Sequence, residues 1–396
     1  MNLLIEKLVY GGDGLSRADG QVIFTPFAGA GEDVSVELEP VRSGTQRARL
    51  VEVLQPSPQR VPPPCPYFGH CGGCHYQHLD YAAQLEAKRG ILIETMRRVG
   101  KIESLPEIET IAGAPYHYRN RVQLHIEDRK LGYRESRSHK LCAIDHCPIS
   151  SPKINACIAA LSKMVTERRW PKFVESIELF TDESGVQLNV LEASQPVARR
   201  FFDWCAEVLP GFVESSLEYR VGEYLYRVSG GSFFQVNRFL LEPMVQAAIG
   251  TAAGESALDI YAGVGLFSLP LAKRFAKVTA VESGAGATRD LTFNAARSSL
   301  QVRIETLQVE EYLRGVLLAP DLVLADPPRA GLGKFVVNKF LEILPPRIHV
   351  VSCDPATLAR DLGPLLTNGY KLERLILLDL FPQTFHMETI AHLVLL

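Results

Sequence analysis

The 396-residue sequence has no apolar run of about 18 or more residues, so no segment is expected to span a membrane. Its first residues, MNLLIEKLVYGGDG, lack the basic region, apolar core and small-residue cleavage site of a secretory signal. Repeats and low-complexity segments are also missing. The net charge is only -3, with 46% hydrophobic and 22% charged residues, as in globular proteins. We therefore expect a cytoplasmic protein of several domains with no membrane contact.

A small net charge does not exclude a local basic surface. Residues 115–140 contain seven Lys and Arg against three Asp and Glu, with aromatic and histidine residues between them. Such a stretch forms either a solvated charged face or a groove that follows phosphates and stacks bases. Under the second interpretation, Arg119 and Arg121 are the predicted contacts to an RNA backbone.

The pattern along the chain changes twice. Residues 1 to about 55 alternate apolar and polar residues between Gly-rich turns, which favours a small β-barrel of the OB type, and the Pro-rich stretch 56–66 follows as a linker. Residues 81–100 show helix periodicity, and residues 115 to about 230 indicate an α+β unit of mostly antiparallel strands. From about residue 232, strands alternate with helices, which predicts a parallel, doubly wound sheet.

A glycine turn in this last region indicates a nucleotide-like ligand. The stretch LDIYAGVGLFSLPLA, residues 258–272, reads as a strand, a turn with Gly263 and Gly265, and a helix expected over residues 266–275. Glu282 ends the next predicted strand, where a carboxylate can bind ribose hydroxyls. Ser268 replaces the third glycine of a dinucleotide fingerprint, which disfavours NAD. The pattern is similar to the first motifs of class I methyltransferases, which bind S-adenosylmethionine.

Two later strand ends carry reactive side chains. Asp326 lies in ADPPRAG, where an ordinary turn is the alternative interpretation. Cys353 lies in SCDPATLARD, between an apolar strand pattern and a helix start that would lower the pKa of its thiol. It is either a nucleophile, a metal ligand or a small buried residue.

The chemistry of uracil methylation needs a thiol and a base. Carbon 5 of a pyrimidine is a poor nucleophile until a thiolate adds to carbon 6, and a base must then remove the carbon-5 proton. Glu388, in FPQTFHMETIAHL, is the predicted base and His386 is the second candidate. A surface carboxylate on a hairpin is the alternative for Glu388.

Four stretches together, GGSFFQVN, DPPRAG, VSCDPATLARDL and FPQTFHMET, resemble the RNA 5-methyluridine methyltransferase family. The resemblance covers residue 230 to the C-terminus. It implies that Cys353 is the nucleophile and Glu388 the base. Arg329, beside the Asp-Pro-Pro motif, is a further predicted contact to RNA. The resemblance also implies a cofactor site formed by Gln235, Tyr261, Gly263, Gly265, Glu282 and Asp326. Leu266, where family members often carry a polar residue, departs from the pattern.

A separate group of cysteines suggests a metal centre. Cys65, Cys71 and Cys74 lie in CPYFGHCGGC, and Cys147 lies much later in HCPIS. Four thiolates could bind zinc or an iron–sulfur cluster, and three close cysteines plus a distant Cys-Pro are more typical of a [4Fe–4S] cluster. Cys142 competes with Cys147 as fourth ligand. The resemblance agrees with a cluster, because one branch of the family combines it with an N-terminal TRAM barrel.

The predicted architecture is a class I, Rossmann-like α/β methyltransferase domain with an N-terminal OB-type TRAM barrel and a central α+β iron–sulfur domain. The barrel is expected over residues 1–58, the central domain over 65–80 and 113–230, and the methyltransferase domain over 81–112 and 231–396. The predicted activity is methylation of uridine carbon 5 by a monomer, with 23S rRNA as favoured substrate and tRNA as the alternative. The competing interpretations are a non-catalytic iron–sulfur RNA-binding protein, an amino-group methyltransferase that needs no Cys353, and a flavin or NAD enzyme.

Overall fold

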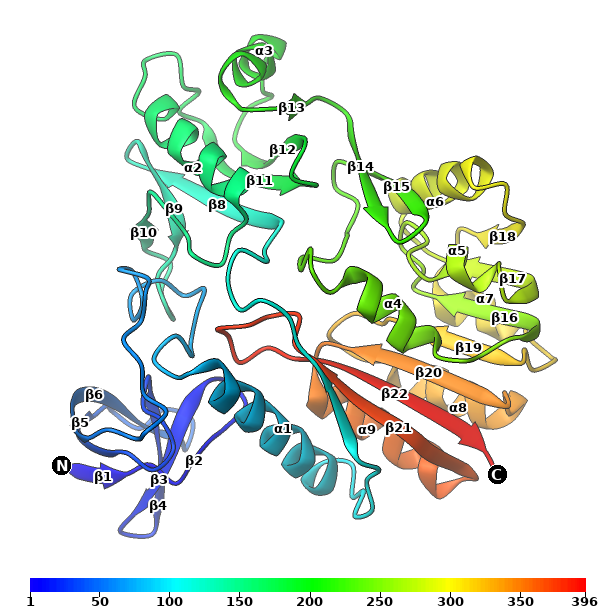
Figure 1. The fold of residues 1–396 in the computed structure, drawn as a ribbon, viewed down its shortest axis with the longest axis horizontal. Coiled ribbons are helices and arrows are strands. Elements are labelled where there is room, and N and C mark those ends of the chain that lie inside the picture. Colours follow the sequence, from blue (N-terminus) through cyan, green and yellow to red (C-terminus); the bar gives the residue numbers. More distant parts are fainter.

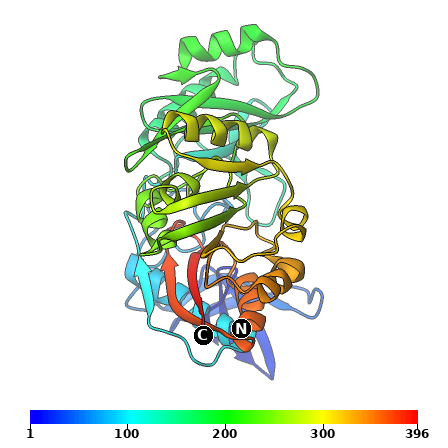
Figure 2. The same cartoon turned by 90° about the vertical axis from the view of Figure 1, so that its right-hand side faces the viewer.

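The computed structural model describes all 396 residues, arranged around three large sheets and one hairpin. Figure 1 shows the N-terminal sheet at the lower left, the central sheet at the upper left and the C-terminal sheet on the right. The view in Figure 2 places the central sheet at the top, beyond the edge of the C-terminal sheet. No helix of the chain is long and apolar enough to cross a membrane.

The N-terminal sheet has six strands in the order β1-β5-β6-β4-β3-β2. Its strands are β1 (Asn2–Leu4), β2 (Lys7–Leu8), β3 (Asp13–Ala18), β4 (Gln21–Pro26), β5 (Asp33–Leu38) and β6 (Gln46–Gln55). Alternate residues turn inward, so that Ile23, Val34 and Val36 form a small core of their own. This arrangement fits the predicted barrel.

The central sheet is antiparallel except for its last pair, β12 and β13. It consists of β8 (Arg121–Glu127), β9 (Lys130–Arg134), β10 (Leu141–Ala143), β11 (Val174–Thr181), β12 (Val186–Ala193) and β13 (Phe212–Val213). Helices α2 (Pro152–Met164) and α3 (Arg199–Val208) share its core, in which Trp170 packs on Trp204. The hairpin of β14 (Ser216–Val221) and β15 (Tyr224–Ser229) then leads into the C-terminal part.

The C-terminal sheet has eight strands in the order β18-β17-β16-β19-β20-β22-β21-β7. The strands are β7 (Ile108–Ile111), β16 (Gly254–Ile260), β17 (Phe275–Val281), β18 (Val302–Glu305), β19 (Leu322–Ala325), β20 (Arg347–Ser352), β21 (Tyr370–Leu378) and β22 (Glu388–Leu395). The helices are α1 (Tyr81–Arg98), α4 (Leu241–Ile249), α5 (Ser268–Leu271), α6 (Ala285–Arg297), α7 (Val309–Arg314), α8 (Gly333–Ile343) and α9 (Pro355–Thr367).

Apolar side chains project from both faces of this sheet, as a doubly wound fold requires. On β16, Leu258 and Ile260 pack in the same core as α1, α8 and α9, whereas Ala257 faces the core that contains α4. The chain runs from β16 to β17 and β18 in one direction and then returns to β19 and β20 on the other side. The predicted class I methyltransferase fold is confirmed, with its topological switch between β16 and β19.

Two local predictions need correction. The sheet is not wholly parallel, because β22 runs antiparallel to both β20 and β21. The helix expected over residues 266–275 is only the four-residue α5, and the chain already enters β17 at Phe275. Pro270 lies in this short helix, and proline has no N–H with which to continue an intrahelical ladder.

Candidate functional site

Four predicted site residues lie directly after parallel strands of the C-terminal sheet. Tyr261 follows β16, Glu282 follows β17, Asp326 follows β19 and Cys353 follows β20. Parallel strands end at the same edge of a sheet, and ligands of such folds bind outside that edge at the topological switch. Residues separated by more than 90 positions in sequence are therefore brought to one site.

The glycine turn after β16 is shaped for close approach. Gly263 and Gly265 have φ angles of +56° and +93°, and a Cβ on Gly265 would lie 2.3 Å from Cδ1 of Leu291. The Gly263 amide donates a hydrogen bond to Oε2 of Glu282 (3.0 Å). The Gly284 amide donates to the other oxygen of the same carboxylate (2.6 Å). Glu282 is thus held in place beside the turn.

Carboxylates dominate this edge of the sheet. Asp326 accepts a hydrogen bond from Nε2 of Gln235 (3.3 Å), and burial raises the pKa of Asp326 to about 7. Asp259, at the end of β16, accepts from the Ser268 hydroxyl, and burial raises its pKa to about 7 as well. Oδ1 of Asp259 is buried without a partner. A concentration of acidic groups suits a positively charged ligand such as a sulfonium.

The antiparallel strand β22 brings Glu388 to the same edge. Because β22 runs opposite to β20, its first residues lie beside the last residues of β20, and Thr389 pairs with Ser352. Glu388 and Cys353 are the next residues along the two strands. Glu388 is only 3% exposed, which is not what a surface carboxylate on a hairpin would show. Burial, followed by the negative charge of Asp326, raises the pKa of Glu388 well above its usual value.

The expected lowering of the Cys353 thiol pKa is wrong. Burial, and then the charge of Glu388, raises the pKa of Cys353 to about 11. Cys353 does precede the helix start, but Asp354 caps α9 and its Oδ1 accepts from the amides of Ala356 and Thr357, both at 2.9 Å. The first amides of the helix are therefore already bonded to a carboxylate.

The 379–387 loop, which leads into Glu388, is anchored by buried polar contacts. The Lys88 ammonium of α1 bonds to Oδ1 of Asp379 (2.5 Å) in an ion pair whose side chains are both fully buried. It also donates to the carbonyl of Phe381 (3.0 Å). Further bonds to this loop come from Tyr81, Gln84, Tyr118 and Asn237. His386 thus lies on this loop and Glu388 directly follows it, and residues from three distant segments hold the loop in place.

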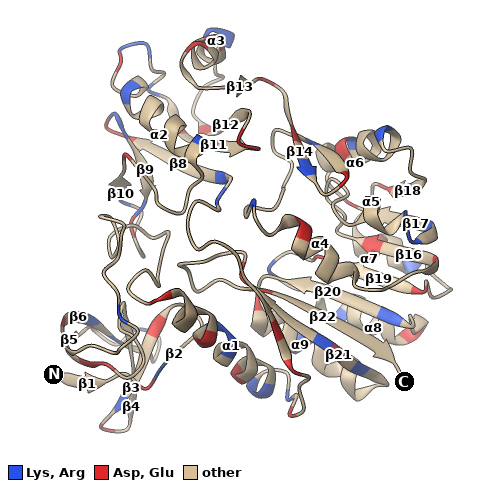
Figure 3. Cartoon of the chain, viewed as in Figure 1, with Lys and Arg blue, Asp and Glu red and all other residues tan.

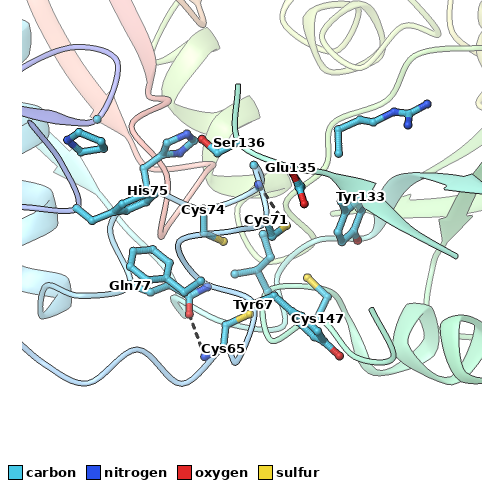
Figure 4. Close-up of a pocket in the computed structure, with 18 of the residues that line it drawn as sticks. Cys65, Tyr67, Cys71, Cys74, His75, Gln77, Tyr133, Glu135, Ser136 and Cys147 are labelled. Atoms are coloured by element: carbon cyan, nitrogen blue, oxygen red, sulfur yellow. Dashed lines mark hydrogen bonds between the residues drawn. The ribbon is translucent and has the colours of Figure 1, made fainter. Parts of the chain in front are cut away.

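The four cysteines predicted as cluster ligands line one cavity of about 530 Å³ between the N-terminal sheet, the central sheet and the 379–387 loop. Figure 4 shows the sulfurs of Cys65, Cys71, Cys74 and Cys147 around a shared space. Cys142 is buried and does not line this cavity. No group of three or more His, Cys, Asp or Glu side chains is placed to hold a single metal ion.

The arginines predicted to contact RNA differ in their surroundings. Arg121 is 8% exposed, its guanidinium lies 4.2 Å from the ring centre of Phe180, and it donates to the carbonyl of Ser232. These contacts cover most of the Arg121 guanidinium, although its Nε and Nη2 have no partner, and its contact with RNA stays a prediction. Arg119 lines the cavity and Arg329 is exposed. Figure 3 shows basic and acidic residues interspersed over the whole chain.

Comparison with known proteins identifies the family of the chain. Residues 206–395 match the sequence model of the tRNA (uracil-5-)-methyltransferase family. An uncharacterized RNA methyltransferase of Aquifex aeolicus is 33% identical over 99% of this chain and 97% of its own length. The 23S rRNA (uracil(1939)-C(5))-methyltransferase RlmD of Pectobacterium atrosepticum is 34% identical over 96% of this chain and 90% of its own. The chain belongs to the RNA uracil-5-methyltransferase family.

A solved structure supports the same family assignment. The tRNA (uracil-54, C5)-methyltransferase of Pyrococcus abyssi, in complex with S-adenosyl-L-homocysteine, matches with a TM-score of 0.79 and 26% identity over 100% of both chains. The protein is therefore an S-adenosylmethionine-dependent RNA uracil-5-methyltransferase. The alternatives of a nicotinamide enzyme, an amino-group methyltransferase and a non-catalytic RNA-binding protein are wrong.

Sequence reasoning did not find two features of this site. It assigned no ligand contact to Asp259, although the unpaired, buried oxygen of this residue lies at the cofactor edge. It also gave no role to Lys88, because a lysine in a helix is ordinarily a solvated surface residue. Asp379, its partner, lies 291 positions away and no local signal connects them.

Proposed function

We propose that the enzyme methylates carbon 5 of a uridine in 23S rRNA through a covalent bond between Cys353 and carbon 6 of the uracil, with Glu388 as the base. The observation that carries this proposal is the pairing of Ser352 with Thr389, because Cys353 and Glu388 are the next residues of these two strands at the cofactor edge. Asp326, directly after the neighbouring strand β19, completes the group.

Gln235, Tyr261, Glu282 and Asp326, together with the turn of Gly263 and Gly265, would hold S-adenosylmethionine. The cofactor supplies an electrophilic methyl group. The side chains fit it, because the acidic edge attracts a cation and the Gly263 position, with no atom within 4 Å of where a Cβ would lie, leaves the turn open to a ligand. The two carboxylates with pKa values of about 7, Asp259 and Asp326, can be charged or neutral near physiological pH.

The reaction then depends on proton transfers among buried groups. The Cys353 thiol, whose pKa of about 11 keeps it protonated at rest, gives its proton to the Asp326 carboxylate as sulfur bonds to carbon 6, which leaves Glu388 free, and the sulfur regains this proton when it is released. The electron pair left at carbon 5 would accept the methyl group that bound S-adenosylmethionine supplies, and S-adenosylhomocysteine would leave. Glu388 takes the remaining proton from carbon 5, the C5=C6 double bond re-forms, and the sulfur–carbon bond breaks. A raised pKa makes Glu388 a stronger base than an exposed carboxylate.

His386 is the less favoured base. Burial lowers its pKa to about 4, and its ring lies 4.1 Å from that of Phe385. It is separated from Glu388 by Met387 and lies on the loop, not on the strand that pairs with β20. The register of β22 therefore supports Glu388.

The proposed RNA substrate rests on the relatives that match over nearly the whole chain and are named for 23S rRNA. Transfer RNA is the alternative, since the family model and the Pyrococcus enzyme are named for it. We propose Arg119 and Arg329 as contacts to the RNA backbone, and we retain the domain limits of 1–58, 65–80 with 113–230, and 81–112 with 231–396. We further propose a monomer that works in the cytoplasm.

A competition between RNAs tests the substrate. We expect labelled S-adenosylmethionine to transfer its methyl group to 23S rRNA, and not to tRNA, when both come from cells without uracil-5-methyltransferase activity. Nuclease digestion and chromatography should identify the product as 5-methyluridine, and primer extension should place it in the 23S molecule. Labelling confined to tRNA would show that the alternative substrate is the correct one.

We also propose that Cys65, Cys71, Cys74 and Cys147 hold a [4Fe–4S] cluster. All four line one cavity, and a cubane cluster needs its thiolates spread over four irons and not gathered on one ion. The Gly73 amide lies 3.4 Å from Sγ of Cys71, as amides do in cluster-binding loops. Burial raises the pKa of Cys71 to about 12, and ligation to a metal would compensate for this by stabilising the thiolate.

The cluster proposal predicts about four irons per chain in protein prepared without air. Cys74→Ser should lose most of the iron and sulfide, because a ligand is missing, whereas Cys142→Ser should keep both. Metal analysis and visible absorption measure the two variants in parallel. One zinc per chain in a colourless protein would contradict the cluster. Loss of iron in Cys142→Ser, with iron retained in Cys147→Ser, would show that Cys142 and not Cys147 is the fourth ligand.

A further inference from the structure

The turn between β2 and β3 of the N-terminal sheet reaches the catalytic edge of the distant C-terminal sheet. The Tyr10 hydroxyl donates to Oδ2 of Asp354 (3.2 Å), the residue after Cys353. The Tyr10 ring also packs edge-on against Phe385, with ring centres 5.4 Å apart and planes at 84°. Phe385 lies on the 379–387 loop, three residues before Glu388. One side chain thus contacts both the segment of the thiol and the segment of the base.

This turn is held at a fixed position relative to the rest of the molecule. Gly12 has a φ of +91°, and a Cβ on it would lie 3.0 Å from Cβ of His75. Asp13 is 4% exposed and bonds to Arg47 within the N-terminal sheet (2.8 Å) and to Arg137 of the central region (2.7 Å). These contacts of the residues that directly follow Tyr10 hold the turn in place and limit the movement of its hydroxyl away from Asp354.

The two carboxylate oxygens of Asp354 accept hydrogen bonds from different parts of the chain. Its Oδ1 accepts the two amides that start α9, and its Oδ2 accepts the Tyr10 hydroxyl. Burial and the charge of Asp354 raise the pKa of Tyr10, so the phenol stays protonated and donates at physiological pH. Without this donor, the second oxygen of a carboxylate adjacent to Cys353 would lose its partner, and the backbone that orients the thiol would gain freedom.

We propose that Tyr10 is a positioning residue for methyl transfer, which joins the Cys353 segment to the Glu388 loop. The N-terminal sheet then completes the active site of the C-terminal domain. This inference rests on the proposed roles of Cys353 and Glu388. The geometry that supports it is the direct contact of Tyr10 with both Asp354 and Phe385.

Steady-state kinetics with labelled S-adenosylmethionine and total RNA from cells without uracil-5-methyltransferase activity test the proposal. Tyr10→Phe keeps the ring but removes the hydroxyl bond to a carboxylate, so kcat should fall about tenfold. KM for RNA should stay within about a factor of two, because ground-state binding is unchanged. Tyr10→Leu, which also loses the contact with Phe385, should have a lower kcat than Tyr10→Phe.

A double-mutant cycle distinguishes a positioning role of Tyr10 from a general loss of protein stability. Asp354→Ser keeps a helix cap but is too short to reach Tyr10, so its loss of kcat should not add to that of Tyr10→Phe. Tyr370→Phe is the matched control, because it removes a buried hydroxyl bond of 2.9 Å to Pro345 far from the site. It should lower the thermal midpoint but leave kcat unchanged.

Three outcomes would overturn the proposal: an unchanged kcat in Tyr10→Phe, a change confined to KM for RNA, or losses that simply add in the double variant. Cys353→Ala is measured in the same series. If that variant keeps turning over, the proposed adduct mechanism fails, whereas the comparison of Tyr10→Phe with Tyr370→Phe still shows whether Tyr10 acts on kcat.

Discussion

Cys353→Ala is expected to lower turnover by at least about 10⁴-fold, because without a thiol at carbon 6 nothing makes carbon 5 nucleophilic. S-adenosylmethionine should still bind, since Gln235, Glu282 and Asp326 are unchanged. Methyl transfer from labelled cofactor to RNA measures the first effect, and calorimetric titration with the cofactor measures the second.

A matched variant controls for the general loss of a cysteine. Cys205 is buried in the core of the central region, far from the cofactor edge, and Cys205→Ala should methylate RNA at the normal rate. Normal turnover by Cys353→Ala would exclude the covalent mechanism. Equal losses in both variants would point to instability, which thermal unfolding of the two proteins would reveal.

Glu388→Gln is expected to stop the reaction one step later. The glutamine has nearly the same shape as the glutamate but cannot take the proton from carbon 5, so the methylated uracil should stay bonded to Cys353. Turnover should fall by about 10²–10⁴-fold, the usual contribution of a positioned base. A protein–RNA adduct that survives denaturation and carries the labelled methyl group should appear on a gel.

The controls for this experiment are variants of residues near Glu388 in the sequence or in the sheet. Adding Cys353→Ala to Glu388→Gln should abolish the adduct, because no sulfur is left to form it. Glu373→Gln, on the exposed side of β21, should neither slow turnover nor trap RNA. If His386→Asn traps the adduct and Glu388→Gln releases product normally, the base is His386.

Both expectations follow from one feature of the fold, the reversed direction of β22. In a wholly parallel sheet, Glu388 at the start of a strand would lie at the edge opposite to Cys353 at the end of one. The antiparallel pairing of β22 with β20 and β21 brings a strand start and a strand end together. A carboxylate can therefore be placed beside the thiol on a paired strand, which holds it more rigidly than a free loop would.

Much of this could be predicted from local patterns. Alternating strand and helix periods indicated the class I fold, and the strand-end positions of Tyr261, Glu282, Asp326 and Cys353 indicated one shared edge, because parallel strands end together. The direction of β22 could not be predicted, since an apolar strand reads the same in either orientation. The length of α5 was also missed, because helix periodicity continued through Pro270.

By itself, the amino-acid sequence determined which side chains are available and at which strand ends they lie, because those follow from short-range periods and turn residues. Only the tertiary structure decided what surrounds them. Burial and the charge of Glu388 raise the pKa of Cys353, where the helix start alone predicted a decrease. The Lys88–Asp379 pair and the Tyr10–Asp354 bond join residues 291 and 344 positions apart. Desolvation and long-range contacts depend on the packing of the whole chain, so no local stretch contains them.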